Sequence, residues 1–236
     1  MARYAAALTS RRGGEVREIL PNRNELGQPV VYARALRLHC ALARDGYTMA
    51  TSRRGRTLHR LAADVAARGV PGDLVDCGVW NGGSTALLSA GAPGRDVWAF
   101  DSFEGLPEPG PLDGTESEGW RGECHGAEER LREAFARFAH PERLRVRRGW
   151  FEATFPAAED QIGAIAVLHC DGDWYASVKL TLETFYPKLS PGGYVVIDDY
   201  GHWVGARRAT DEFRGRLDIS APLVRVDYTG HYWRKP

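Results

Sequence analysis

Short apolar runs alternate with helical patterns along most of this chain, and this alternation is what most restricts its possible folds. Apolar runs bounded by turn residues indicate strands at 74–79, 96–102, 143–150, 164–171 and 193–200. Patterns with helical spacing lie between them, at about 83–90, 126–139, 174–187 and 205–216. Strands that alternate with helices in this way form parallel sheets with right-handed crossovers. We therefore predict an α/β fold with a mostly parallel sheet.

The two ends of the chain and one long loop are predicted to surround this sheet. Residues 1–46 contain a helical pattern that ends at Gly46, which predicts a helical N-terminal cover segment. The tail has strand-like pieces on either side of 228–230, which predicts a hairpin and an antiparallel C-terminal strand. The irregular stretch 105–127 follows the second strand, and we expect it to be an active-site lid within a single domain of residues 1–236.

The charge balance argues for a small-molecule partner. Lys plus Arg and Asp plus Glu both count 31, and the pI is about 7.1, which disfavours binding to nucleic acid or to an anionic membrane. The four cysteines are scattered without a CxxC pair, as expected for reduced thiols in a cytoplasmic protein. We find neither a signal peptide nor an apolar run long enough to span a membrane. We expect a cytoplasmic homo-oligomer.

A glycine-rich turn follows the first predicted strand and opens a helix, in the run VDCGVWNGGST at 75–85. Gly78, Gly82 and Gly83 allow a sharp turn and a close approach to a ligand, and the helix N-terminus offers unpaired N–H groups. At the end of the next strand, Asp101 could accept hydrogen bonds from two ribose hydroxyls. This pair of features favours a nucleoside site, although Asp101 could instead cap the turn before Ser102.

Four acidic residues follow two neighbouring strands and give the strongest chemical signal. Asp171 and Asp173 come after one strand, and Asp198 and Asp199 come after the next. Because like charges so close together repel, we expect a cation to neutralise them. Oxygen ligands favour Mg²⁺, Ca²⁺ or Mn²⁺, and no Cys/His spacing offers a zinc site. In the alternative, Asp173 caps a helix and Asp198 and Asp199 form a turn.

Several ordered runs resemble the macrocin-type O-methyltransferases, which methylate sugar hydroxyls in bacterial natural-product biosynthesis. They include YTM (47–49), GVPGDLVDCGVWNGGS, VWAFDSFEGLP, RRGWFEATFP, HCDGDWYASV and LETFYPKLSPGGYVVIDDYG, and the resemblance runs from about residue 44 to the C-terminus. It implies a Rossmann-like class I methyltransferase fold, S-adenosylmethionine as the methyl donor and Mg²⁺ as the metal. It also implies that Asp171, Asp198 and Asp199 are metal ligands and that Asp173 is the general base.

The cofactor site predicted with this resemblance combines the glycine-rich turn, the end of the second strand and two further segments. Its residues are Thr48, Met49, Asp76, Gly78, Trp80, Gly83, Ser84, Asp101, Ser102, Gly149, Trp150 and Phe151. The chain departs from the family pattern where Asp76 replaces Glu, where Asn81 replaces Arg and where His169-Cys170 replace a pair such as Arg-Leu, and the segment after Pro107, which bears on the acceptor, also differs from that pattern. These departures predict an altered surrounding of the site but remove no metal ligand.

The sequence leaves some alternatives open. The general base could be His125, His169 or His202 instead of Asp173. The acceptor could be a catechol-like phenol, since both it and a sugar diol present two adjacent oxygens. A nucleotide-binding protein without activity, or a dehydrogenase, could share the fold, but the chain has GVWNGG where a dehydrogenase usually has GxGxxG.

Other charged and aromatic side chains also have structural interpretations. We expect Arg53-Arg54 and Arg147-Arg148 to be solvated surface charges. Trp150 and Phe151 could flank an adenine ring or pack in the core.

Overall fold

The computed structural model describes residues 29–236, and its centre is a seven-stranded sheet. The strands are β1 (Asp73–Cys77), β2 (Val97–Asp101), β3 (Leu144–Arg148), β4 (Ile165–Cys170), β5 (Leu189–Ile197), β6 (Val224–Arg225) and β7 (His231–Arg234). Their spatial order is β3-β2-β1-β4-β5-β7-β6. Strands β1 to β5 are parallel, whereas β7 is antiparallel to β5 and to β6. The predicted mostly parallel sheet with a C-terminal antiparallel strand is confirmed.

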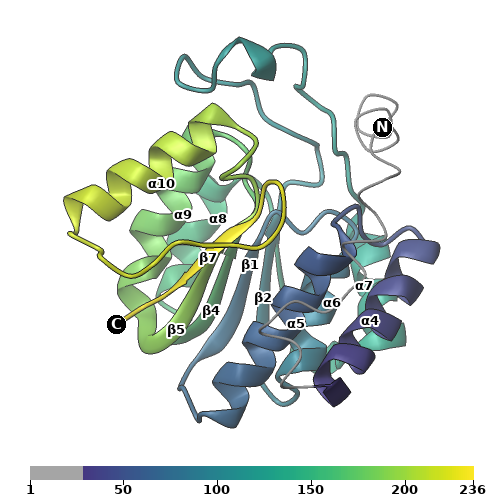
Figure 1. Ribbon diagram of the computed structural model, residues 1–236. Helices are drawn as coiled ribbons and strands as arrows, with labels where there is room; N and C mark the ends of the chain where they lie inside the picture. The colour runs from purple at the N-terminus through teal and green to yellow at the C-terminus, as the bar shows by residue number, and fades with distance from the viewer. Residues whose placement is uncertain (1–28) are drawn as a thin grey trace.

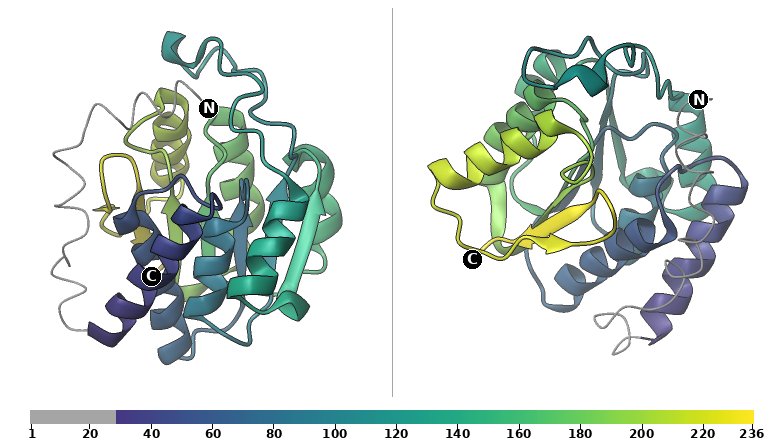
Figure 2. Two further views of the ribbon diagram at one scale, coloured as in Figure 1. Left: turned by 90° about the vertical axis from the view of Figure 1, so that its right-hand side faces the viewer. Right: turned by 45° about the horizontal axis from the view of Figure 1, so that its top comes forward.

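Helices cover both faces of the sheet (Figures 1 and 2). One face carries α4 (Pro29–Arg44), α5 (Ser52–Ala67), α6 (Gly83–Gly91) and α7 (Glu128–Phe138). The other carries α8 (Phe151–Glu159), α9 (Tyr175–Phe185) and α10 (Val204–Arg216). Short 3-10 helices span Thr115–Ser117, Pro141–Arg143 and Tyr186–Lys188. None of the helices within 29–236 is long and apolar enough to cross a membrane.

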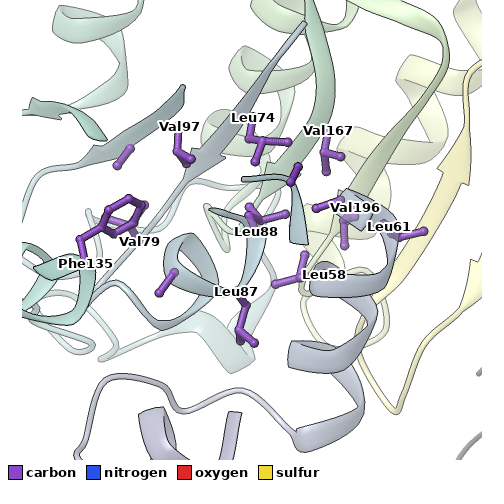
Figure 3. Packing of buried hydrophobic residues seen from close by; sticks show 14 of the residues in the cluster. Leu58, Leu61, Leu74, Val79, Leu87, Leu88, Val97, Phe135, Val167 and Val196 are labelled. Atoms are coloured by element: carbon purple, nitrogen blue, oxygen red, sulfur yellow. The ribbon is translucent and has the colours of Figure 1, made fainter. Parts of the chain in front are cut away.

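The strands at the centre of the sheet are apolar on both faces because helices cover both. In β1, Leu74 packs into the core beneath α5 and α6, and the next residue, Val75, packs into the core beneath α8 and α9. Figure 3 shows the first of these cores, in which Leu58 of α5 and Leu88 of α6 point toward Leu74. The apolar face of α5 explains its position, since Leu58, Leu61 and Val65 recur at helical spacing.

The sequence missed one helix. The run that begins at Phe151 forms α8, although Pro156 lies inside it. Proline in a helix interior removes one backbone hydrogen bond, and this is why the sequence indicated only a turn here. The predicted C-terminal hairpin is confirmed, with the Val226 N–H donating to the Gly230 carbonyl at 2.8 Å. Residues 1–28 of the predicted cover segment lie outside the described residues, and the described remainder includes α4.

The strand order indicates at which end of the sheet a ligand would bind. From β1 the chain runs outward through β2 to β3 and then returns to β4 on the other side of β1. At such a reversal the loops beyond the carboxyl ends of neighbouring strands diverge and leave a crevice. The irregular segment 105–127 lies beyond this edge, at the top of Figure 1.

Candidate active site

A cavity opens at the carboxyl ends of β1, β2, β4 and β5. Its wall includes most of the predicted site residues, namely Thr48, Met49, Gly78, Trp80, Gly83, Ser84, Asp101, Ser102, Trp150, Phe151, Asp171, Asp173 and Asp198. The predicted residues outside this lining are Asp76, Gly149 and Asp199. Leu106, Pro107 and Cys124 bring the segment 105–127 against the same cavity.

Two positions in the β1–α6 turn must be glycine because neighbouring protein atoms leave no room for a side chain. Gly78 has a φ of 91°, and a Cβ atom there would lie 1.8 Å from the backbone oxygen of Asp171. At Gly83 a Cβ atom would lie 2.5 Å from the Cβ of Thr48. The absence of side chains at Gly78 and Gly83 therefore lets the turns after β1 and β4 and the segment before α5 close around one cavity.

Asp101 closes a turn and also faces the cavity. Its Oδ2 accepts a hydrogen bond from the Trp80 N–H at 2.8 Å, and its Oδ1 accepts one from the Phe103 N–H at 2.7 Å. Burial raises the pKa of Asp101, and these backbone donors oppose the rise. Each carboxylate oxygen has a further lone pair. The turn-capping role is thus present and leaves Asp101 able to accept hydrogen bonds from a ligand.

Asp76 lies outside the cavity lining and holds residues of the cavity wall in place through hydrogen bonds. Its Oδ2 accepts hydrogen bonds from the hydroxyls of Ser84 at 2.9 Å and Thr85 at 2.7 Å, and its Oδ1 lies 2.7 Å from Nδ1 of His169. The side chain is fully buried. Asp76 therefore fixes Ser84, which lines the cavity, and the ring of His169.

His169 bridges two carboxylates. Its Nε2 lies 3.3 Å from Oδ1 of Asp198, while Nδ1 contacts Asp76. Burial lowers the pKa of His169, but the two carboxylates outweigh burial and raise that pKa to about 9. With both ring nitrogens engaged, His169 is poorly placed to accept a proton from a substrate. His125 and His202, the other histidines considered as bases, are not among the residues that line the cavity.

The four predicted acids lie in two groups that share Asp171, and neither group contains all three predicted ligands, because Asp198 is in one and Asp199 in the other. Carboxylate oxygens of Asp171, Asp173 and Asp199 lie within 4.8 Å of one another, and so do ligand atoms of His169, Asp171 and Asp198. Burial, followed by repulsion from neighbouring carboxylates, raises the pKa of Asp171 and of Asp199 well above the usual range. Such a cluster of oxygen ligands is suited to a hard cation.

Asp198 differs from the other acids because it has a buried cationic partner. Arg54 donates to Oδ2 of Asp198, and it also bonds Asp227 and the hydroxyl of Thr229 in the C-terminal hairpin. Burial raises the pKa of Asp198, but Arg54 and His169 more than offset this, and the net shift is downward.

The expectation that Arg54 is a solvated surface charge is wrong. Its side chain is 6% exposed and lines the cavity. A signal was present in the sequence, because Arg54 precedes Leu58 and Leu61 at spacings of four and seven residues and so lies on the apolar face of α5. The sequence reasoning also gave no role to Asp227, which anchors Arg54 from the hairpin.

Asp173 stands at the cavity wall in an unusual backbone conformation, with a φ of 57°. Its Oδ1 accepts a hydrogen bond from the indole N–H of Trp203 at 2.9 Å. Burial raises the pKa of Asp173 to about 7, against the effect of the Trp203 hydrogen bond. A carboxylate whose pKa lies near neutrality is suited to general base catalysis.

Phe151 packs against the core and also lines the cavity. Its ring stacks on Phe155 of α8 with centroids 4.7 Å apart, and it also lines the cavity. Trp150 lines the cavity and is 37% exposed.

The comparisons with known proteins decide the family. The model of the family described as macrocin O-methyltransferase (TylF) matches residues 29–235. The chain belongs to this family. It is therefore an O-methyltransferase that uses S-adenosylmethionine, and the sequence resemblance is confirmed.

Characterised relatives of this O-methyltransferase act on natural products. It is 40% identical to 8-demethyl-8-(2,3-dimethoxy-alpha-L-rhamnosyl)-tetracenomycin-C 4'-O-methyltransferase of Streptomyces olivaceus over 80% of this chain and 75% of the relative. It is 36% identical to demethyldecarbamoylnovobiocin O-methyltransferase of Streptomyces niveus over 81% of this chain and 76% of the relative. The solved structure of the O-methyltransferase NovP matches with a TM-score of 0.73 and 36% identity, over 80% of this chain and 82% of that one. This similarity confirms the class I methyltransferase fold.

Proposed function

We propose that this enzyme transfers the methyl group of S-adenosylmethionine to a hydroxyl group of a sugar in a glycosylated natural product. The names of its relatives support the acceptor class, since one methylates a rhamnosyl group and another, from Micromonospora griseorubida, is mycinamicin III 3''-O-methyltransferase. The observation that carries the proposal is the acidic cluster of the half-buried Asp171 and the buried Asp173, Asp198 and Asp199 at the cavity.

In this proposal the donor occupies the part of the cavity between the segment 47–51, the β1–α6 turn and Asp101. Asp101 accepts hydrogen bonds from the ribose hydroxyls, and Trp150 and Phe151 lie against the adenine. The carboxylates of Asp171 and Asp173, which line the same cavity, favour the positive charge of the sulfonium group.

The acidic cluster fits a divalent cation. The pKa values of Asp171 and Asp199 are raised because burial and mutual repulsion disfavour their charges, and a bound cation would relieve both. We propose Asp171, Asp198 and Asp199 as the ligands of Mg²⁺ or a similar hard ion. When bound, the ion would orient two adjacent acceptor oxygens and lower the pKa of the hydroxyl group.

Asp173 is then the proton acceptor. The methyl group of a sulfonium is already activated, so the protein has mainly to align the acceptor oxygen with it and to remove a proton as the bond forms. Asp173 lines the cavity, where its carboxylate faces the space for an acceptor hydroxyl, and Trp203 holds its Oδ1.

The test is an assay with labelled S-adenosylmethionine, Mg²⁺ and a panel of glycosides and catechols. We expect methylation of a glycoside, loss of turnover with a chelator, and loss of metal-dependent turnover in Asp171→Asn with donor affinity retained. Methylation of catechols alone would refute the acceptor class, and full activity of Asp171→Asn in chelator would refute the metal role. Asp173→Asn should bind metal normally and turn over slowly; loss of metal binding would instead make Asp173 a ligand.

We also propose that the enzyme is a single-domain cytoplasmic homo-oligomer with residues 105–127 as its lid. The four cysteines are all free, which supports a reducing compartment, and the balanced charge supports a small-molecule partner over nucleic acid or membrane. The oligomeric state is a prediction that light scattering on the purified enzyme tests.

A further inference from the structure

The segment 105–127 is anchored at the amino ends of α9 and α10. Asp113 is buried within it, and its Oδ1 accepts a hydrogen bond from the Tyr175 N–H at 2.6 Å, at the start of α9. The indole N–H of Trp174 donates to the Pro107 carbonyl at 2.9 Å. This segment is therefore attached next to the turn that carries Asp171 and Asp173.

Trp203 connects this anchored region to Asp173. It is 2% exposed and directly precedes α10. Its ring packs edge-on against Trp174, with centroids 4.9 Å apart, and against Trp120 of the segment 105–127, with centroids 5.4 Å apart. The contacts with Trp174 and Trp120 leave the indole of Trp203 little freedom to rotate.

The indole N–H of Trp203 donates to Oδ1 of Asp173, 30 residues away in the sequence. Trp203 is not among the residues that line the cavity, whereas Asp173 is. The positive φ of Asp173 is a conformation that few non-glycine residues adopt, so the direction of its side chain depends on the surrounding structure. The Trp203 hydrogen bond is therefore placed to fix the rotamer of Asp173 from outside the cavity.

We infer that Trp203 is a positioning residue for methyl transfer: its clamped indole N–H holds the Asp173 carboxylate in the orientation that accepts the proton of the acceptor. This inference rests on the proposed role of Asp173 as general base. It also links the orientation of that base to the segment 105–127 through the contact between Trp120 and Trp203.

The test compares two variants that each remove one indole N–H. Trp203→Phe keeps a ring in the aromatic cluster but loses the hydrogen bond to Asp173. We expect kcat to fall by about tenfold or more, with the KM values of donor and acceptor unchanged, because orientation of the base matters in the transition state and not in binding. Trp98→Phe is the matched control, since Trp98 of β2 is also buried, lies outside the cavity lining and donates to Asp73 at 3.0 Å instead. Its kcat should be unchanged.

A double-mutant cycle separates positioning from general packing. If Trp203 acts through Asp173, adding Trp203→Phe to Asp173→Asn should lower kcat no further. An equal loss in both backgrounds, a kcat of Trp203→Phe near that of the unaltered enzyme, or a loss no larger than in Trp98→Phe would overturn the inference. Normal kcat in Asp173→Asn would instead show that the proposed base is wrong, so the two failures are distinguishable.

Should Trp203→Phe fail to fold, benzothienylalanine at position 203 replaces the N–H by sulfur and keeps the size of the ring system. The same fall in kcat is expected with this side chain. Unchanged kcat with it would overturn the inference.

Discussion

Arg54→Met removes a buried cation from between two carboxylates. The Arg54 guanidinium bonds Asp198 on one side and contacts Asp227 at 3.1 Å on the other, and these three side chains are at most 7% exposed. Methionine replaces the aliphatic part of the arginine side chain but not the guanidinium group, so the change removes mainly the charge and its hydrogen bonds. Asp198 keeps its contact with His169 at 3.3 Å, and Asp227 keeps the backbone N–H of Gly230 at 2.7 Å.

Removal of one partner from a buried ion pair typically costs about 3 to 5 kcal/mol. Because both carboxylates retain other hydrogen bonds, we expect a loss near the lower end, about 3 kcal/mol, out of a domain stability of about 5 to 15 kcal/mol. The assay is urea unfolding followed by tryptophan fluorescence near neutral pH, with a chelator present so that bound metal cannot offset the loss.

The matched control is Arg68→Met at the end of the same helix. Arg68 pairs with Asp64 at the surface, where both side chains are more than a quarter exposed, so its replacement should cost about 1 kcal/mol or less. If Arg54→Met lost no more stability than Arg68→Met, the reasoning that Arg54 neutralises the buried carboxylates would be refuted.

Three further predictions concern the turn, two buried histidines and the predicted lid. Gly78→Ala should cost several kcal/mol of stability or prevent folding, because the φ of Gly78 is 91° and the new Cβ would lie 1.8 Å from a backbone oxygen. Gly69→Ala is the control and should cost only about 1 kcal/mol, because a Cβ there has no atom within 4 Å. Thermal unfolding of the two variants compares these costs. Burial lowers the pKa of His39 and of His59 from 6.5 to about 4, so both stay neutral in the folded chain while the unfolded chain takes up protons. Stability should therefore be highest above about pH 6.5 and fall toward pH 4, by about 3 kcal/mol for each histidine, in urea titrations of the unaltered protein and of a variant with leucine at both positions. Asp113→Ala removes the side chain that caps α9, and it should cost about 1 to 2 kcal/mol and speed proteolysis within 105–127.

Each of these predictions has an outcome that contradicts it. Similar melting temperatures for Gly78→Ala and Gly69→Ala would show that the turn after β1 moves away at little cost. An equally steep loss of stability at low pH in the variant without the two histidines would assign that loss to other groups. Unchanged cleavage of 105–127 in Asp113→Ala would mean that Asp113 does not hold this segment.

The sequence predicted the fold well where a single pattern controls an element. Strands buried on both faces are apolar runs, and helices beside them have one apolar face, so each is visible locally. The exception, α8, is short and contains Pro156, and its formation depends on Phe155 packing against Phe100 of β2 and Phe185 of α9. Such tertiary contacts have no local signature.

The acidic cluster was predictable for a related reason. Parallel strands deliver the residues that follow them to the same edge of the sheet, so Asp171 and Asp198 had to approach each other once β4 and β5 were neighbours. The partners that tune these acids were not predictable in this way. Arg54 contacts Asp198 from a helix 144 residues earlier in the chain. Trp203, which follows β5, contacts Asp173, which follows β4 and lies 30 residues earlier.

The register of the sheet links two buried polar residues of the site. Asp76 of β1 and His169 of β4 are register partners on adjacent strands, and their side chains meet at 2.7 Å. His169 then reaches Asp198 with its second nitrogen, so one imidazole connects the floor beneath Ser84 to the acidic cluster. Asp76 and His169 therefore depend on each other, and the role of neither can be interpreted from its own position in the sequence.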